Sequence, residues 1–259
     1  EGEIQFQSEA AGGLIDLSKE KPGSSLIRQV RGGEIALIFQ EPMTSFSPVH
    51  TVGNQVIEAI QLHMDISKKN AMARAEELFD LVGIPNPRSR LNEYAYQLSG
   101  GLRQRAMIAM ALSADPKLLI ADEPTTALDV TTQAQILELL KTLQKQNNMA
   151  ILYITHNLGV IAEVADDVVV MYLGKAVEVG NVDDIFHDPQ HPYTQGLLRS
   201  IPSIYTEGEG RLPSIRGTIP HPFNRPSGCT FRTRCPDYID GECNTSIPEL
   251  QSIGKTDRM

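Results

Sequence analysis

The stretch Leu-Leu-Ile-Ala-Asp-Glu-Pro-Thr-Thr-Ala-Leu-Asp, residues 118–129, carries the strongest structural signal in this chain. Its first four residues are all apolar, which is typical of a strand inside a parallel sheet that is covered on both faces. Asp122 and Glu123 follow directly, at the carboxyl end of the predicted strand. Ligands of open α/β sheets bind at that end of the strands. The stretch therefore predicts a buried strand with two carboxylates at a candidate site.

The two carboxylates suit different tasks. The first can hold Mg²⁺, because a hard cation prefers oxygen ligands. The second can take a proton from an attacking water. Paired acids also occur in ordinary charged turns at strand ends, so the pair needs support from the rest of the chain.

Outward from this stretch, apolar runs alternate with helical patterns. The fold class predicted is α/β with a mostly parallel sheet. Residues 41–97 show helical patterns only, with Ser67 opening an amphipathic helix that Gly83 closes. The predicted strands are 35–39, 118–121, 150–155, 168–172 and 176–179, and the predicted helices are 55–64, 67–82, 103–114, 131–146 and 158–165.

Composition narrows the class of protein. The chain has 259 residues, 41% hydrophobic and 21% charged, as in ordinary globular proteins. Its net charge of -9 argues against a nucleic-acid partner. No apolar run approaches the roughly 20 residues that span a bilayer. A cytoplasmic location follows as the expectation.

Three further motifs lie near predicted strand ends or helix starts. Ser99, Gly100 and Gly101 open a helix, where backbone N–H groups can bind an anion. The same three residues also read as a plain helix cap followed by a glycine turn. Gln40 follows the strand at 35–39, and His156 follows the strand at 150–155. Each is weak evidence when taken alone.

The order and spacing of these motifs resemble the ATP-binding cassette (ABC) family. The resemblance identifies Gln40 with the Q-loop, 98–104 with the signature, 118–123 with Walker B, 127–129 with the D-loop and His156 with the switch histidine. Leu102 departs from the glutamine that many members have in the signature. The resemblance implies a P-loop NTPase-like cassette with a helical subdomain and a C-terminal extension.

The resemblance also implies roles. Asp122 and Gln40 would hold Mg²⁺, and Glu123, His156 and Gln40 would act on ATP. The residues that would contact nucleotide, partly that of an opposite cassette, are Ser99, Gly100, Gly101, Gln104 and Asp129. A second cassette, identical or not, is therefore an expected partner.

Residues 41–48, 191–198 and 228–236 resemble the dipeptide, oligopeptide and nickel importer branch of the family. This implies an ATPase that powers import through transmembrane permease subunits, with a substrate-binding protein acting indirectly, on the inner face of the membrane. A soluble non-transport ABC ATPase and a regulatory cassette are the alternatives. The expected divisions are 1–40 and 98–190 for the ATPase core, 41–97 for the helical subdomain and 191–259 for the extension.

The sequence contains no complete G-x-x-x-x-G-K-[ST] phosphate-binding loop. The resemblance to the ABC family implies that this loop lies upstream of Glu1. Residues 1–259 alone are expected to show no ATPase activity. Without the P-loop strand, apolar neighbours such as Leu119 and Leu152 are expected to be exposed.

Two further expectations concern single segments. Cys229, Cys235 and Cys243 could hold a metal if a fourth ligand is supplied, although their spacing matches no zinc-finger or ferredoxin pattern. The resemblance to some members of the importer branch makes an iron–sulfur cluster one candidate, and three free thiols are the alternative. Met43 and Phe46 are candidates for contact with a membrane subunit, and the alternative is that they pack inside the cassette.

Overall fold

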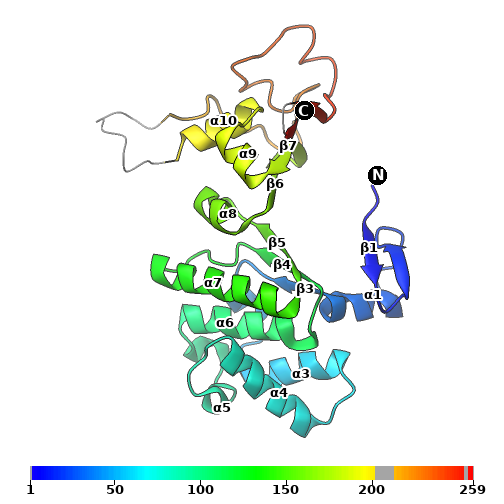
Figure 1. Ribbon diagram of the computed structural model, residues 1–259, viewed down its shortest axis with the longest axis vertical. Helices are drawn as coiled ribbons and strands as arrows, with labels where there is room; N and C mark the ends of the chain where they lie inside the picture. The colour runs from blue at the N-terminus through cyan, green and yellow to red at the C-terminus, as the bar shows by residue number, and fades with distance from the viewer. Residues whose placement is uncertain (1, 202–212, 254–255, 259) are drawn as a thin grey trace. The chain divides into compact units, whose positions relative to one another are not determined.

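The computed structural model describes residues 2–201, 213–253 and 256–258. The chain forms two compact units, Glu1–His156 and Asn157–Met259, each of which is described here by itself (Figure 1). The boundary between the two units follows His156, whereas the C-terminal extension was expected to begin at residue 191.

The first unit is built on a parallel sheet in the order β3-β4-β5. Its strands are β3 (Ile35–Ile38), β4 (Leu118–Asp122) and β5 (Ala150–Ile154), so the strands predicted from the apolar runs are confirmed. One face of the sheet is buried, and Leu119 on that face is fully covered. The expectation that Leu119 would be exposed was therefore wrong. Leu152, on the opposite face, is 51% exposed, as expected.

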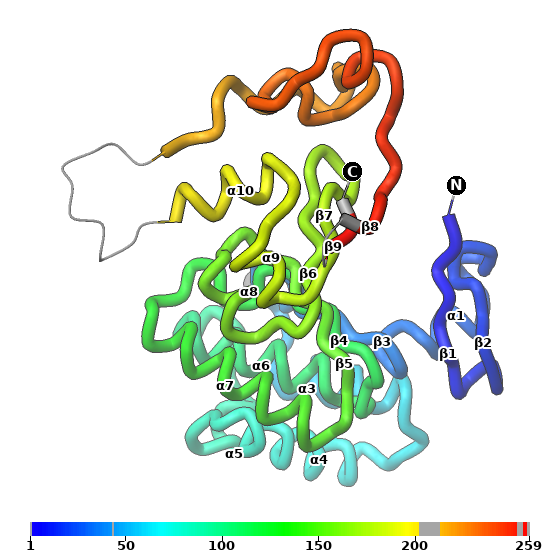
Figure 2. The backbone as a smooth tube through the Cα atoms, turned by 45° about the horizontal axis from the view of Figure 1, so that its top comes forward, coloured from blue at the N-terminus to red at the C-terminus, as the bar shows by residue number. Residues whose placement is uncertain are grey.

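Helices cover the buried face of this sheet. Figures 1 and 2 show α3, α6 and α7 gathered on the same side of β3, β4 and β5. Ser67 caps α4 by accepting a hydrogen bond from the Asn70 amide, and Gly83 has the positive φ that follows a helix end. The α-helices of this unit are α1 (Ser25–Gln29), α2 (Pro42–Ser45), α3 (Val52–His63), α4 (Lys68–Leu81), α5 (Pro87–Arg90), α6 (Gly100–Ala111) and α7 (Val130–Asn147).

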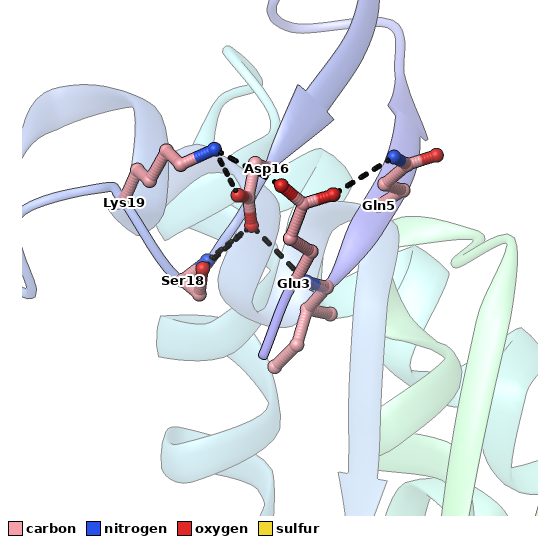
Figure 3. A network of polar contacts seen from close by, with 6 residues as sticks. Glu3, Gln5, Asp16, Ser18 and Lys19 are labelled. Atoms are coloured by element: carbon pink, nitrogen blue, oxygen red, sulfur yellow. Dashed lines mark hydrogen bonds and ion pairs between the residues drawn. The ribbon is translucent and has the colours of Figure 1, made fainter. Parts of the chain in front are cut away.

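An N-terminal hairpin, β1 (Gln5–Ser8) and β2 (Gly13–Asp16), was not predicted from the sequence. Figure 3 shows how its base is tied together. The Asp16 carboxylate accepts hydrogen bonds from the Ile4 amide and from the Ser18 amide and hydroxyl, and it pairs with the Lys19 ammonium at 2.9 Å. The Lys19 ammonium also reaches Glu3 at 3.4 Å. These contacts close the open end of the hairpin.

Glu34 holds the hairpin turn to the rest of the first unit. Its buried carboxylate accepts hydrogen bonds from the Ser8 hydroxyl at 2.9 Å, the Glu9 amide at 3.0 Å and the Ala10 amide at 2.8 Å. A close ion pair between Lys117 and Glu9 adds a second connection.

The second unit contains an antiparallel sheet in the order β6-β7-β9-β8. The predicted strands 168–172 and 176–179 form β6 and β7, joined by a tight turn in which Leu173 and Gly174 both have positive φ. Such two-residue turns connect antiparallel strands, and β6 and β7 belong to a different sheet from β3, β4 and β5. The elements of the unit are α8 (Leu158–Val164), β6 (Asp167–Tyr172), β7 (Lys175–Asn181), α9 (Val182–His187), α10 (Pro192–Arg199), β8 (Gln251–Ile253) and β9 (Thr256–Arg258).

Candidate functional site

The ends of the three parallel strands bring three predicted site residues together. Gln40 follows β3, Glu123 follows β4 and His156 follows β5. The Gln40 amide Nε2 donates to Glu123 Oε2 at 2.8 Å, and His156 Nδ1 lies 2.9 Å from Glu123 Oε1. Residues far apart in the sequence thus converge on one carboxylate at the edge where α/β sheets bind ligands.

The Glu123 backbone is held in an uncommon conformation. Its φ of 45° lies in the left-handed region, which non-glycine residues adopt only where the surroundings enforce it. The Glu123 amide donates to the Ile154 carbonyl at 2.8 Å, and its carbonyl accepts from the Thr126 amide at 3.1 Å. The turn after β4 therefore fixes where the carboxylate leaves the chain.

Thr126 is a fourth member of this cluster that the sequence analysis missed. Its hydroxyl donates to Glu123 Oε2 at 2.8 Å. The hydrogen bonds from Thr126 and then from His156 hold the pKa of Glu123 below its ordinary value. The Glu123 side chain is 19% exposed, so most of it is covered by neighbouring groups.

Asp122 closes β4 and is half-buried beside these residues. A carboxylate and the amide oxygen of Gln40 are hard oxygen ligands, which suit Mg²⁺ together with phosphate oxygens. The described residues contain no group of three or more His, Cys, Asp or Glu side chains placed to hold a metal ion. The chemistry of the donors fits Mg²⁺ only if a ligand supplies further oxygens.

The signature segment begins α6 as a capped helix. Ser99 is the N-cap, and its hydroxyl accepts from the Leu102 amide. A Cβ on Gly101 would lie 2.9 Å from Cγ2 of Thr132 at the start of α7, whereas one on Gly100 would lie 3.8 Å from Leu128. The Ser99 cap thus serves the first turn of α6, and the glycine at position 101 leaves room for Thr132 of the same unit.

Asp129 caps α7 in the same neighbourhood. Its carboxylate accepts from the Thr132 amide at 3.0 Å and the Thr132 hydroxyl at 2.7 Å, and these two bonds lower the pKa of Asp129. Thr132 thus contacts both the D-loop aspartate and the signature glycine.

Gln104, also in the signature segment, is buried within the first unit. Its side chain is 3% exposed, on the buried side of α6. A nucleotide contact from outside the unit would require the helix to move, so the structure gives no support for that role.

The three cysteines belong to the second unit and line one pocket of about 400 Å³ together with His191, Phe231 and Glu242. Burial raises the pKa of the Cys235 thiol above its ordinary value. Since the described residues, all three cysteines included, form no metal-binding group, the iron–sulfur and metal hypothesis has no support here.

Of the two candidate docking residues after Gln40, the structure describes the side chain of Phe46 alone. Phe46 is 4% exposed and packs in the core of the first unit, so the contact predicted for it with a membrane subunit was wrong. The side chain of Met43 lies outside the described part of the chain. Among the described residues, no helix is both long and apolar enough to cross a membrane.

Comparisons with known proteins show the family of this chain. Residues 2–126 match the family model described as "ABC transporter". Residues 177–243 match the family model described as "Oligopeptide/dipeptide transporter, C-terminal region". The chain belongs to the ABC transporter family.

Proteins similar to this chain in sequence include ATP-binding proteins of dipeptide and oligopeptide transport. It is 53% identical to the dipeptide transport ATP-binding protein DppD of Haemophilus influenzae over 88% of this chain and 68% of that protein. It is 54% identical to the oligopeptide transport ATP-binding protein OppD of Bacillus subtilis over 90% of this chain and 63% of that protein. The chain therefore spans about two thirds of the length of these relatives.

Solved structures confirm the fold class. An ATP-binding cassette solved as a dimer in a post-hydrolysis state with ADP and Pi aligns with a TM-score of 0.58 and 25% identity, over 65% of this chain and 70% of that one. CbiO1 from Clostridium perfringens, part of the transporter complex cbiONQ, aligns with a TM-score of 0.55 and 26% identity, over 68% of each chain. The predicted ABC-type α/β core is confirmed.

Proposed function

We propose that this chain supplies the ATP-hydrolysing cassette of an importer for peptides. The observation that carries the proposal is the convergence of Gln40 and His156 on the Glu123 carboxylate at the ends of three adjacent parallel strands. The match of residues 177–243 to the C-terminal region of oligopeptide and dipeptide transporters supports the peptide branch over a soluble non-transport ATPase.

In this proposal Glu123 accepts a proton from the water that attacks the terminal phosphate of ATP. Asp122 and the amide oxygen of Gln40 help to hold Mg²⁺, which neutralises phosphate charge when it is bound. Gln40 and His156 must turn away from Glu123 toward the phosphate, because a carboxylate whose lone pairs are occupied is a weak base. Nucleotide binding would thereby activate the base.

Partners follow from the same proposal. Ser99, Gly100 and Gly101 face the nucleotide of a second cassette, with Asp129 beside them, so the working unit is a pair of cassettes. Dimeric cassettes among the structural neighbours support this arrangement. Permease subunits transmit the motion at the cytoplasmic face of the membrane, with residues 41–97 as the helical subdomain that meets them.

The test uses the natural full-length gene product, assembled with its transporter partners. Glu123→Gln is expected to keep ATP binding and to lower hydrolysis by about 10²–10⁴-fold, the usual cost of losing a general base. Glu138→Gln, the same change at an exposed position of α7, is the matched control and should leave turnover unchanged. Normal turnover in Glu123→Gln would refute the assignment.

The substrate needs a separate experiment. A strain that lacks the gene should lose uptake of labelled di- and oligopeptides and regain it when the gene is restored. Loss of nickel uptake with normal peptide uptake would move the protein to the nickel importers.

A further inference from the structure

Thr126 differs from the other two side chains that donate to Glu123. Gln40 and His156 belong to segments after β3 and β5, whereas Thr126 lies three residues beyond Glu123 in the same turn. The Thr126 amide also bonds to the Glu123 carbonyl, so backbone and side chain of the two residues are joined twice. Thr126 therefore moves with Glu123, while the two distant donors can leave independently.

The carboxylate needs such a local donor because its backbone alone does not fix it. The backbone of Glu123 has a positive φ, but each sp³ torsion of its side chain still has several staggered rotamers available. Thr126 Oγ1 and Gln40 Nε2 share Oε2, and His156 Nδ1 lies at Oε1. When Gln40 and His156 turn to a ligand, the Thr126 hydroxyl is the one side-chain donor of these three that stays.

We propose that Thr126 is a positioning residue that keeps the Glu123 carboxylate oriented toward the attacking water after Gln40 and His156 have released it. This inference rests on the proposed function of the site. Oε2 stays bound to Thr126, and Oε1, freed from His156, faces the water and takes its proton. Misorientation of a catalytic group by about 1 Å is enough to slow a reaction strongly.

The experiment compares three variants in the natural gene product with its partners. Thr126→Val replaces the hydroxyl by a methyl group, Thr126→Ser keeps the hydroxyl, and Thr131→Val makes the same change at an exposed position of α7. Thr126→Val is expected to lower kcat about 10-fold with KM for ATP unchanged, which corresponds to the loss of one hydrogen bond to a charged group. Thr126→Ser and Thr131→Val are expected within about twofold of the unchanged protein.

A readout other than turnover separates positioning from folding or binding. The Kd of each variant for MgATP, measured in the background of Glu123→Gln so that no hydrolysis occurs, should equal that of Glu123→Gln alone. The thermal unfolding midpoint should also stay unchanged, since Thr126 is exposed. If Thr126→Val lowers the midpoint, Thr126→Ala is tested in its place.

Three outcomes would overturn the proposal: a normal kcat in Thr126→Val, an equal loss in Thr126→Ser, or a loss that appears in KM or Kd alone. The parallel Glu123→Gln measurement keeps the two hypotheses distinct. If Glu123→Gln abolishes hydrolysis and Thr126→Val does not slow it, the positioning role fails and the proposed function stands. If Glu123→Gln turns over normally, the proposed function fails first.

Discussion

Gly101→Ala is expected to destabilise the first unit through a clash with Thr132. A Cβ at Gly101 would lie 2.9 Å from Thr132 Cγ2, closer than side-chain carbons normally approach. Thr132 cannot turn away easily, because its hydroxyl is bonded to Asp129 at 2.7 Å and β-branched side chains have few rotamers. At Gly100 the new Cβ would meet Leu128 at 3.8 Å, an ordinary contact.

The magnitude follows from two opposing effects. Overpacking a well-packed position costs about 1–3 kcal/mol. Replacing a helical glycine by alanine returns up to about 1 kcal/mol. Gly101→Ala should therefore lose about 0.5–2 kcal/mol, whereas Gly100→Ala should be neutral or slightly stabilising.

The assay is thermal unfolding of the natural gene product. For a unit of this size 1 kcal/mol shifts Tm by roughly 2–4 °C, so Gly101→Ala should melt several degrees below Gly100→Ala. Thr132→Ser removes Cγ2 but keeps the hydroxyl on Asp129, so the double variant Gly101→Ala, Thr132→Ser should recover the lost stability. Equal melting of the two alanine variants, or no recovery in the double variant, would refute the packing argument.

Two further predictions concern the hairpin anchor and the phosphate site. Burial by itself would raise the pKa of Glu34, but hydrogen bonds from the Ala10 amide, the Ser8 hydroxyl and the Glu9 amide outweigh it and lower the pKa. The stabilisation by Glu34 is therefore complete above its ordinary pKa of 4.5 and is lost as the pH falls through the lower folded value. Glu34→Gln should cost about 1–3 kcal/mol at pH 7 in urea unfolding, with the difference from the unchanged protein shrinking below pH 4, and a pH-independent difference would contradict this. Residues 1–259 expressed alone should give no micromolar binding isotherm with MgATP in calorimetry, because they contain no G-x-x-x-x-G-K-[ST] loop to surround the phosphates; a clear isotherm would show that the nucleotide site is misplaced.

Local patterns predicted the parallel core well, because its strands carry their own signal. Leu118–Ala121 is apolar throughout and becomes β4, and Ser67 caps the helix that it was expected to open. The hairpin of β1 and β2 was missed, since Gln5–Ser8 has one large apolar residue, and the buried end of the strand is held by a bond from Ser8 to the distant Glu34. A local sequence pattern around β1 cannot indicate a bonding partner as distant in the sequence as Glu34.

The burial of Gln104 shows a second limit of sequence reasoning. Residues 106–109 of α6 are all buried, so this helix is covered on several sides rather than along one stripe. A helix covered all round gives no amphipathic signal that separates inward from outward positions. The position of Gln104 in a signature motif indicated a ligand contact, but the packing of the helix determines where its side chain lies.

The hydrogen bond from Thr126 to Glu123 could not be predicted from local sequence patterns, for a related reason. It depends on the positive φ of Glu123, which only the surrounding structure enforces, since the amide of Glu123 is held by the Ile154 carbonyl on the next strand. The same bond ties the turn that carries the base to the strand that carries His156. A shift of β5 relative to β4 would therefore change the position of His156 relative to the Glu123 carboxylate. The geometry of the site is thus set by the pairing of the two strands, and substitutions that loosen that pairing should impair the site without touching any of its side chains.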